Sequence, residues 1–96
     1  MFALLLKTKR APLPKTIQNN AYRELIARLA DARTKAGMTQ QAVADLLGKP
    51  QSYVAKVEGL ERRLDVIEFL TMAAAIGFDP MPAIKSAWRE IRATSK

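Results

Sequence analysis

The stretch that decides the fold runs from Thr39 to Glu58 and reads TQQAVADLLGKPQSYVAKVE. A helix is expected to begin at Thr39, because its hydroxyl can accept a hydrogen bond from a backbone N–H of the first turn. Gly48 and Pro50 then predict a turn, since glycine adopts a positive φ at low cost after a helix and proline has no N–H to donate. A second helix is expected to start at Gln51. The stretch therefore predicts two short helices joined by a tight turn.

Apolar spacing indicates which face of each of these two helices is buried. In the first helix the residues expected on the buried face are Ala42, Val43, Leu46 and Leu47. In the second helix the inward-facing pair, three positions apart, is Val54 and Val57. The side chains left on the outer face of the second helix are Gln51, Ser52, Tyr53 and Lys56.

Two helices joined by a turn of about three or four residues form a helix-turn-helix unit, whose second helix enters the major groove of DNA. An amide such as that of Gln51 donates and accepts at once and so matches the adenine edge, whereas Lys56 is suited to guanine acceptors or to phosphate. The alternative is that these polar residues form an ordinary solvated helix face. Helix length, turn and charge together favour base reading, with four candidates: Gln51, Ser52, Tyr53 and Lys56.

The same region contains a specific combination of residues at defined spacings. It consists of Arg33, Gly37-Met38-Thr39-Gln40, Ala44, Leu47-Gly48, Gln51-Ser52, Val54, Glu58 and Arg62. In this combination the chain from Leu25 to about Met81 resembles the Cro and lambda-repressor-like helix-turn-helix family of bacterial and phage regulators, also called the xenobiotic-response-element type. The resemblance covers a little over half of the chain.

The resemblance implies a role for each matching residue. Gln40 matches the family residue that contacts a backbone phosphate and braces the recognition helix. Arg33 and Glu58 match a structural pair in which the arginine is held by a carboxylate, and Arg62 matches the arginine that follows the recognition helix. We expect phosphate contacts from four residues: Gln40, Lys49, Arg62 and Arg63.

The chain departs from the family pattern in the loop after the second helix. The family usually places glycine two residues after the glutamate, where this chain has Leu60, and Gly59 lies one place earlier. The backbone of this loop can therefore differ from that of the family. Pro50 stands where a serine or threonine cap is common, so the recognition helix is expected to start without a side-chain cap.

Composition bounds the class of protein. The chain has 96 residues, of which 49% are hydrophobic, which is enough for one compact domain with one core. Its net charge of +7 suits a polyanionic partner. Cysteine and histidine are absent, and no Gly-rich phosphate loop or paired carboxylates are visible, so we expect no disulfide, metal site, cofactor or enzymatic activity.

The N-terminal region divides into an apolar run and a basic run. Met1–Leu6 is too short for a membrane span or a signal-peptide core, which predicts a cytoplasmic protein. Phe2–Leu6 is expected to dock on the body of the protein or on a partner subunit. The following KTKRAPLPK contains two prolines and no acid, which predicts an extended arm that either follows DNA or is a solvated terminus.

Three further helices are expected outside the central stretch. The first is capped by Asn19 or Asn20, ends before Gly37 and buries Tyr22, Leu25, Ile26 and Leu29. The fourth starts at a capping box of Asp65 and Glu68, ends at Gly77 and buries Ile67, Leu70, Ala73, Ala74 and Ile76. The fifth starts at Asp79-Pro80, runs to about Ala93 and presents a stripe of Ile84, Ala87, Trp88 and Ile91. Trp88 is expected either in the core or at a subunit interface.

These observations predict an all-α, five-helix, lambda-repressor-like domain with a helix-turn-helix at about 39–58. We divide the chain into an N-terminal arm (1–18), a DNA-binding domain (19–79) and a C-terminal helix that packs on the core or forms an interface (80–96). The expected function is sequence-specific regulation of transcription, most simply as a repressor that binds a palindromic duplex operator as a homodimer. The alternatives are an antitoxin that also binds a toxin protein, and an RNA-binding or coactivator module.

Overall fold

The computed structural model describes residues 12–94, which form five helices and no strand. The helices are α2 (Lys15–Lys35), α3 (Gln40–Leu47), α4 (Gln51–Glu58), α5 (Val66–Ile76) and α6 (Met81–Thr94). The predicted all-α, five-helix architecture is confirmed. The apolar run Phe2–Leu6 and most of the predicted arm, residues 1–11, lie outside the described residues.

Helix α2 begins at Lys15, so the predicted cap at Asn19 or Asn20 is wrong. Pro14 occupies the N-cap position in an extended conformation, with φ −61° and ψ 139°. Because proline has no N–H and its φ is already fixed, it fits the start of a helix. The Gln18 side chain also donates to the Leu13 carbonyl at 3.1 Å, which supports the first turn. The two asparagines are therefore interior residues of the helix.

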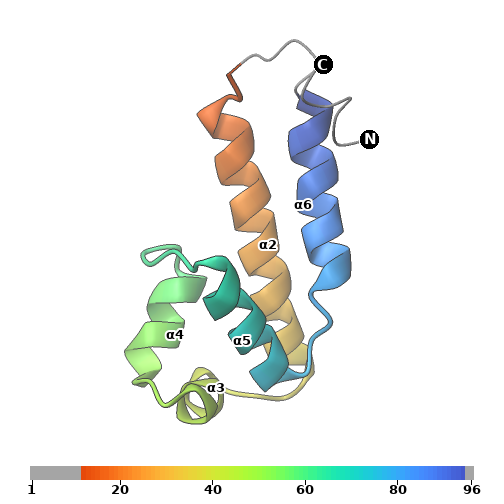
Figure 1. Ribbon diagram of the computed structural model, residues 1–96. Coiled ribbons are helices and arrows are strands. Elements are labelled where there is room, and N and C mark those ends of the chain that lie inside the picture. Colours follow the sequence, from red (N-terminus) through yellow and green to blue (C-terminus); the bar gives the residue numbers. More distant parts are fainter. Residues whose placement is uncertain (1–11, 95–96) are drawn as a thin grey trace.

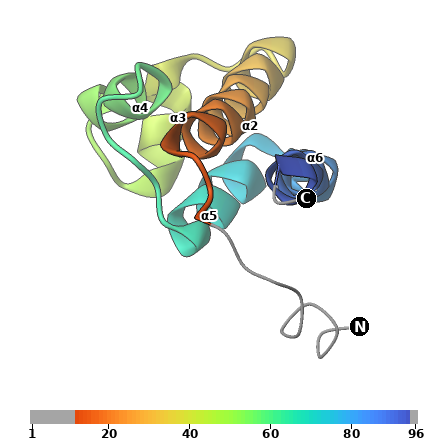
Figure 2. The ribbon, with the colours of Figure 1, turned by 90° about the horizontal axis from the view of Figure 1, so that it is seen from above.

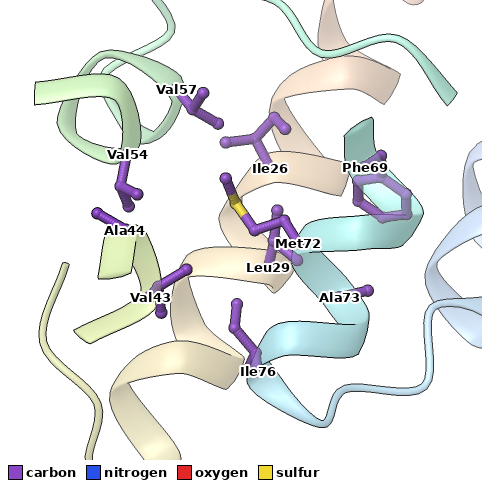
Figure 3. Close-up of a cluster of buried hydrophobic side chains, with 10 residues drawn as sticks. All are labelled: Ile26, Leu29, Val43, Ala44, Val54, Val57, Phe69, Met72, Ala73 and Ile76. Carbon is purple, nitrogen blue, oxygen red and sulfur yellow. The ribbon is translucent and has the colours of Figure 1, made fainter. Parts of the chain in front are cut away.

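The five helices form an elongated molecule with extents of 46 × 24 × 21 Å. The antiparallel helices α2 and α6 lie side by side, and α3, α4 and α5 gather around the C-terminal half of α2 (Figures 1 and 2). The buried core is built by α2 to α5 and consists of Ile26, Leu29, Val43, Ala44, Val54, Val57, Phe69, Met72, Ala73 and Ile76 (Figure 3). This core fixes α4 against the rest of the domain.

The buried face of α5 differs from the prediction at three positions. Ile67 is 69% exposed, and Leu70 and Ala74 are also exposed, whereas Ala73 and Ile76 are buried as expected. Phe69 and Met72 complete the buried face. The sequence VIEFLTMAAAI is apolar on nearly every side, so its period does not select one face, and the partner helices decide which residues are buried.

Helix α3 shows a similar difference. Val43 and Ala44 are buried, but Leu46 is 64% exposed, contrary to its predicted place on the buried face. Leu47, its neighbour, packs partly against the core. Leu46 lies about 160° around the helix axis from the buried Ala44, whereas Leu47 lies about 40° from the buried Val43.

The predicted caps of the central helices are confirmed. The Thr39 hydroxyl accepts from the Ala42 N–H at 3.0 Å. Asp65 and Glu68 form the capping box, with bonds of 2.7 and 2.9 Å. Helix α6 begins one residue later than predicted, at Met81, whose N–H donates to the Asp79 carboxylate at 3.1 Å.

Gly48 makes the turn between α3 and α4 possible, because it adopts the left-handed conformation with φ 66°. A Cβ atom added to it would meet no other atom within 4 Å, so a substitution there introduces backbone strain without a clash. We expect Gly48→Ala to lower the free energy of unfolding by about 1–2 kcal/mol, the cost of the left-handed region for an L-residue. Urea unfolding measures this value, and the exposed Ser52→Ala variant is the control, with an expected change below about 0.5 kcal/mol. If Gly48→Ala left the free energy of unfolding unchanged, the turn would be able to adopt another backbone conformation.

Leu60 supplies the left-handed residue in the loop after α4, with φ 64°. Gly59, by contrast, has φ −81° and does not need the freedom of glycine at this angle. The loop is closed by the Glu61 N–H, which donates to the Lys56 carbonyl at 2.8 Å. The departure noted in the sequence therefore leaves a leucine in a conformation that normally favours glycine.

Candidate nucleic-acid interface

Helix α4 exposes one polar face to solvent. Val54 and Val57 are completely buried, which fixes the rotation of the helix about its axis. The opposite face presents Gln51, Ser52 and Lys56, all of them exposed as predicted. These three side chains start in the first turn and continue one turn along, as the base-reading residues of a recognition helix do.

A continuous chain of polar contacts joins the first residue of α4 to the interior. The Gln51 side-chain amide donates to Oε1 of Gln40 at 2.7 Å, and the Gln40 amide donates to Oε1 of Glu58 at 3.0 Å. Arg33 donates to both carboxylate oxygens of Glu58, at 2.6 and 3.0 Å, and to the Met38 carbonyl at 2.7 Å. The chain holds the Gln51 amide through one N–H, which leaves its oxygen and second N–H available for another partner.

The pair of Arg33 and Glu58 anchors this chain. The two side chains are only 16% and 11% exposed, so water screens their attraction weakly. The hydrogen bond that Arg33 donates to Glu58 raises the pKa of Arg33 above its ordinary value, against the opposing effect of burial. The two charges therefore neutralise each other, and the pair links the C-terminal end of α2 to the C-terminal end of α4.

Tyr53 is half-buried, and two cations lie over its ring, one from the turn before α4 and one from the loop after it. Lys49 Nζ lies 5.3 Å from the ring centroid, and the Arg62 guanidinium lies 4.7 Å from it. Burial raises the pKa of Tyr53, and the charge of Glu68 adds to the effect, so the phenol is neutral at physiological pH. Tyr53 holds Lys49 and Arg62 beside α4, and its assignment as a base reader stays a prediction.

Arg62 also forms an ion pair that sequence reasoning missed. Its guanidinium donates to the two oxygens of Glu68 at 3.0 and 3.3 Å. The hydrogen bond from Arg62, followed by that from the Asp65 N–H, lowers the pKa of Glu68. The contact therefore contributes its full stability at pH values above the ordinary pKa of glutamate. This contribution is lost as the pH falls through the lowered pKa of Glu68. The only signal in the sequence was the spacing of six residues across a loop.

Arg63 contacts a different helix, α2. Its guanidinium stacks on the Tyr22 ring at 4.0 Å from the centroid, and the Tyr22 hydroxyl accepts from the Leu64 N–H at 3.1 Å. Tyr22 is thus a residue at the rim of the core, as its spacing predicted. The two neighbouring arginines diverge: Arg62 lies beside α4, and Arg63 lies against α2.

Residues 12–94 contain neither a candidate metal site nor a helix that could span a membrane. Within this range no group of three or more acidic, histidine or cysteine side chains could hold a metal ion. None of the helices described there is both long and apolar enough to cross a membrane.

Comparison with known proteins identifies the family. A helix-turn-helix family model matches residues 29–81, just over half of the chain. A solved structure described as an XRE-family like protein from Pseudomonas syringae pv. tomato str. DC3000 is 47% identical, with a TM-score of 0.73, and the match covers 78% of this chain and 92% of that one. The chain belongs to the XRE family of helix-turn-helix proteins. A search of curated proteins gave no match.

Membership of the XRE family confirms the resemblance seen in the sequence and the lambda-repressor-like class of the fold. It also supports the general function, since this is a family of DNA-binding transcription regulators. The matched range contains the helix-turn-helix and the whole polar chain from Arg33 to Gln51. The match to the helix-turn-helix family model ends at residue 81, the first residue of α6.

Proposed function

We propose that this chain binds a specific duplex DNA sequence through α4 and acts as a transcriptional repressor in the cytoplasm. The observation that carries the proposal is the orientation of Gln51 by Gln40 and Glu58. An exposed glutamine held by a buried ion pair is preorganised, so little conformational entropy is lost when it binds a base. Its oxygen and second N–H match the N6 amino group and N7 of adenine. Ser52, Lys56 and Tyr53 complete the proposed base-reading set.

Affinity is proposed to come mainly from phosphate contacts. Lys49 and Arg62 converge on Tyr53 at the side of α4, where they can contact a backbone that flanks the major groove. Gln40 and Arg63 are the remaining candidates. A net charge of +7 favours this mode of binding, because each neutralised phosphate releases counterions.

Arg62→Ala tests the phosphate role. We expect it to weaken binding to specific and random duplexes alike and to reduce the slope of log K against log salt by about one. Fluorescence anisotropy at several salt concentrations measures both effects. Lys85→Ala is the matched control, because Lys85 is an exposed cation on α6, away from α4, and its loss should leave the slope unchanged. A normal salt slope for Arg62→Ala would mean that Glu68 keeps the guanidinium from the DNA.

One recognition helix reads only a few base pairs, so we propose that two copies bind a palindrome with half-sites about 34 Å apart. The decisive experiment is selection of bound duplexes from a random pool at near-physiological salt. A palindromic motif with that spacing is the expected result. Binding without any enriched sequence would overturn the specific-regulator proposal, and an enriched single half-site would overturn the dimer.

An antitoxin role is the second candidate function. It is favoured by an apolar side chain on α6 beyond residue 81, where the family-model match ends: Trp88 is 50% exposed. Such a surface suits a protein partner. Co-expression with the product of a small neighbouring gene tests the idea: an antitoxin restores growth that this product arrests, and a Trp88→Ser variant does so less well.

A further inference from the structure

An apolar groove lies on the face of the molecule formed by α2, α6 and the start of α5. Its volume is about 240 Å³, and its lining is almost entirely apolar. The lining side chains include Tyr22, Leu25, Leu64, Val66, Phe69 and Ile84. The carboxylate residue Asp65 is the one charged residue that lines it. The groove is separate from the exposed polar face of α4.

The rim of the groove also exposes apolar surface to solvent. Val66, which lines the groove, is 70% exposed. A groove that is lined and bordered by exposed apolar side chains is the kind of surface that normally binds a partner.

The chain itself contains a segment of matching chemistry. Phe2–Leu6 reads FALLL and is outside the described residues. The seven residues from Lys7 to Leu13 connect it to α2, and fully extended they span up to about 23 Å. Tyr22 lies eight residues beyond the N-cap Pro14, about 12 Å along the helix axis. The connection is therefore long enough for the segment to fold back to the groove.

Charge and tethering favour the same occupant. The connecting segment contains Lys7, Lys9 and Arg10 and no acid, which complements Asp65 at the groove. A short tether gives the attached segment an effective concentration in the millimolar range. A segment from a second copy would have to compete with that concentration. The segment of the same chain is thus the favoured occupant.

We propose that Phe2–Leu6 docks in this groove of its own chain. The apolar side chains of the segment then cover Val66 and the neighbouring lining residues, and the basic connection passes along the end of α2. The docked segment makes no contact with the exposed face of α4, so the proposal does not depend on DNA binding.

Disulfide trapping tests the proposal directly, because the natural chain has no cysteine. In the full-length double variant Leu4→Cys, Val66→Cys, docking should produce an intrachain disulfide on mild oxidation, at a rate independent of protein concentration. The matched control is Leu4→Cys, Ala27→Cys. Ala27 is exposed on α2, and about 160° around the helix separates it from Leu25. We expect cross-linking to be at least about tenfold slower in this control.

Three further results test the docking of Phe2–Leu6. Adding Phe2→Ser and Leu5→Ser to the Val66 pair should slow its oxidation to the rate of the control, because the apolar side chains that drive docking are lost. Equal rates for the two cysteine pairs would overturn the proposal, since the segment would then have no preferred position. Disulfide-linked dimers in place of monomers would also overturn it and would show that the groove takes the segment of a second copy.

Discussion

Gln51→Ala is expected to weaken binding to the selected operator by about 1–3 kcal/mol and to leave binding to random duplexes unchanged. The truncation removes the amide that Gln40 holds in place, and with it the matched donor and acceptor for one base. It exposes Gln40 to water, which can replace the lost hydrogen bond, so the free energy of unfolding should change by less than about 0.5 kcal/mol. Titrations against the operator and against scrambled DNA measure the difference.

The matched control for this variant is Gln41→Ala. Gln41 is also an exposed glutamine, but on α3, where it donates to Asp45 at 2.7 Å. Its loss should leave both affinities unchanged. If Gln51→Ala weakened operator and random DNA equally, Gln51 would be a backbone contact and the base-reading assignment would fail. Selection with the variant protein should also relax the preference at a single base position in each half-site.

Glu58→Ala is expected to lower the free energy of unfolding by about 3 kcal/mol, the lower end of the range for a buried ion pair that loses one partner. The change leaves the guanidinium of Arg33 largely buried without its carboxylate and removes the acceptor of the Gln40 amide. This is a large fraction of the stability of a small domain. Urea unfolding, followed by circular dichroism, measures the loss.

Glu24→Ala is the control for the lost charge. Glu24 pairs with Arg28 at 3.8 Å on the exposed side of α2, and such surface pairs contribute about 0–1 kcal/mol. A comparable loss in the two variants would show that Glu58 acts only through net charge. Because Glu58 also orients Gln40, we expect the folded fraction of Glu58→Ala to bind its operator less tightly than the natural protein does.

The helix-turn-helix was predictable because its signals are local. Thr39 and Gly48 define the ends of α3 through their own backbone and side-chain chemistry, whatever the rest of the chain does. The capping box of Asp65 and Glu68 belongs to the same class. Exposure of Gln51 on α4 followed from the strict spacing of the valines on the opposite side.

The features that were missed depend on tertiary contacts. Ile67 and Phe69 are both apolar residues of α5, and only the packing of α2 and α3 decides that Phe69 is the buried one. The ion pair of Arg62 and Glu68 needs the loop conformation in which Leu60 has a positive φ. Neither the partner helices nor that loop conformation can be derived from periodicity alone, since periodicity reports a helix and not its neighbours.

The antiparallel arrangement of α2 and α6 (Figure 1) has a practical consequence for experiments on living cells. Helix α2 is about 31 Å long, and its first turn and the last turn of α6 lie together at the end of the molecule opposite α3 (Figure 1). A fluorescent protein or a surface linker joined at either end of the described region would be attached far from the exposed face of α4. Tagged versions should therefore bind DNA as the untagged chain does, which makes single-molecule imaging on DNA feasible.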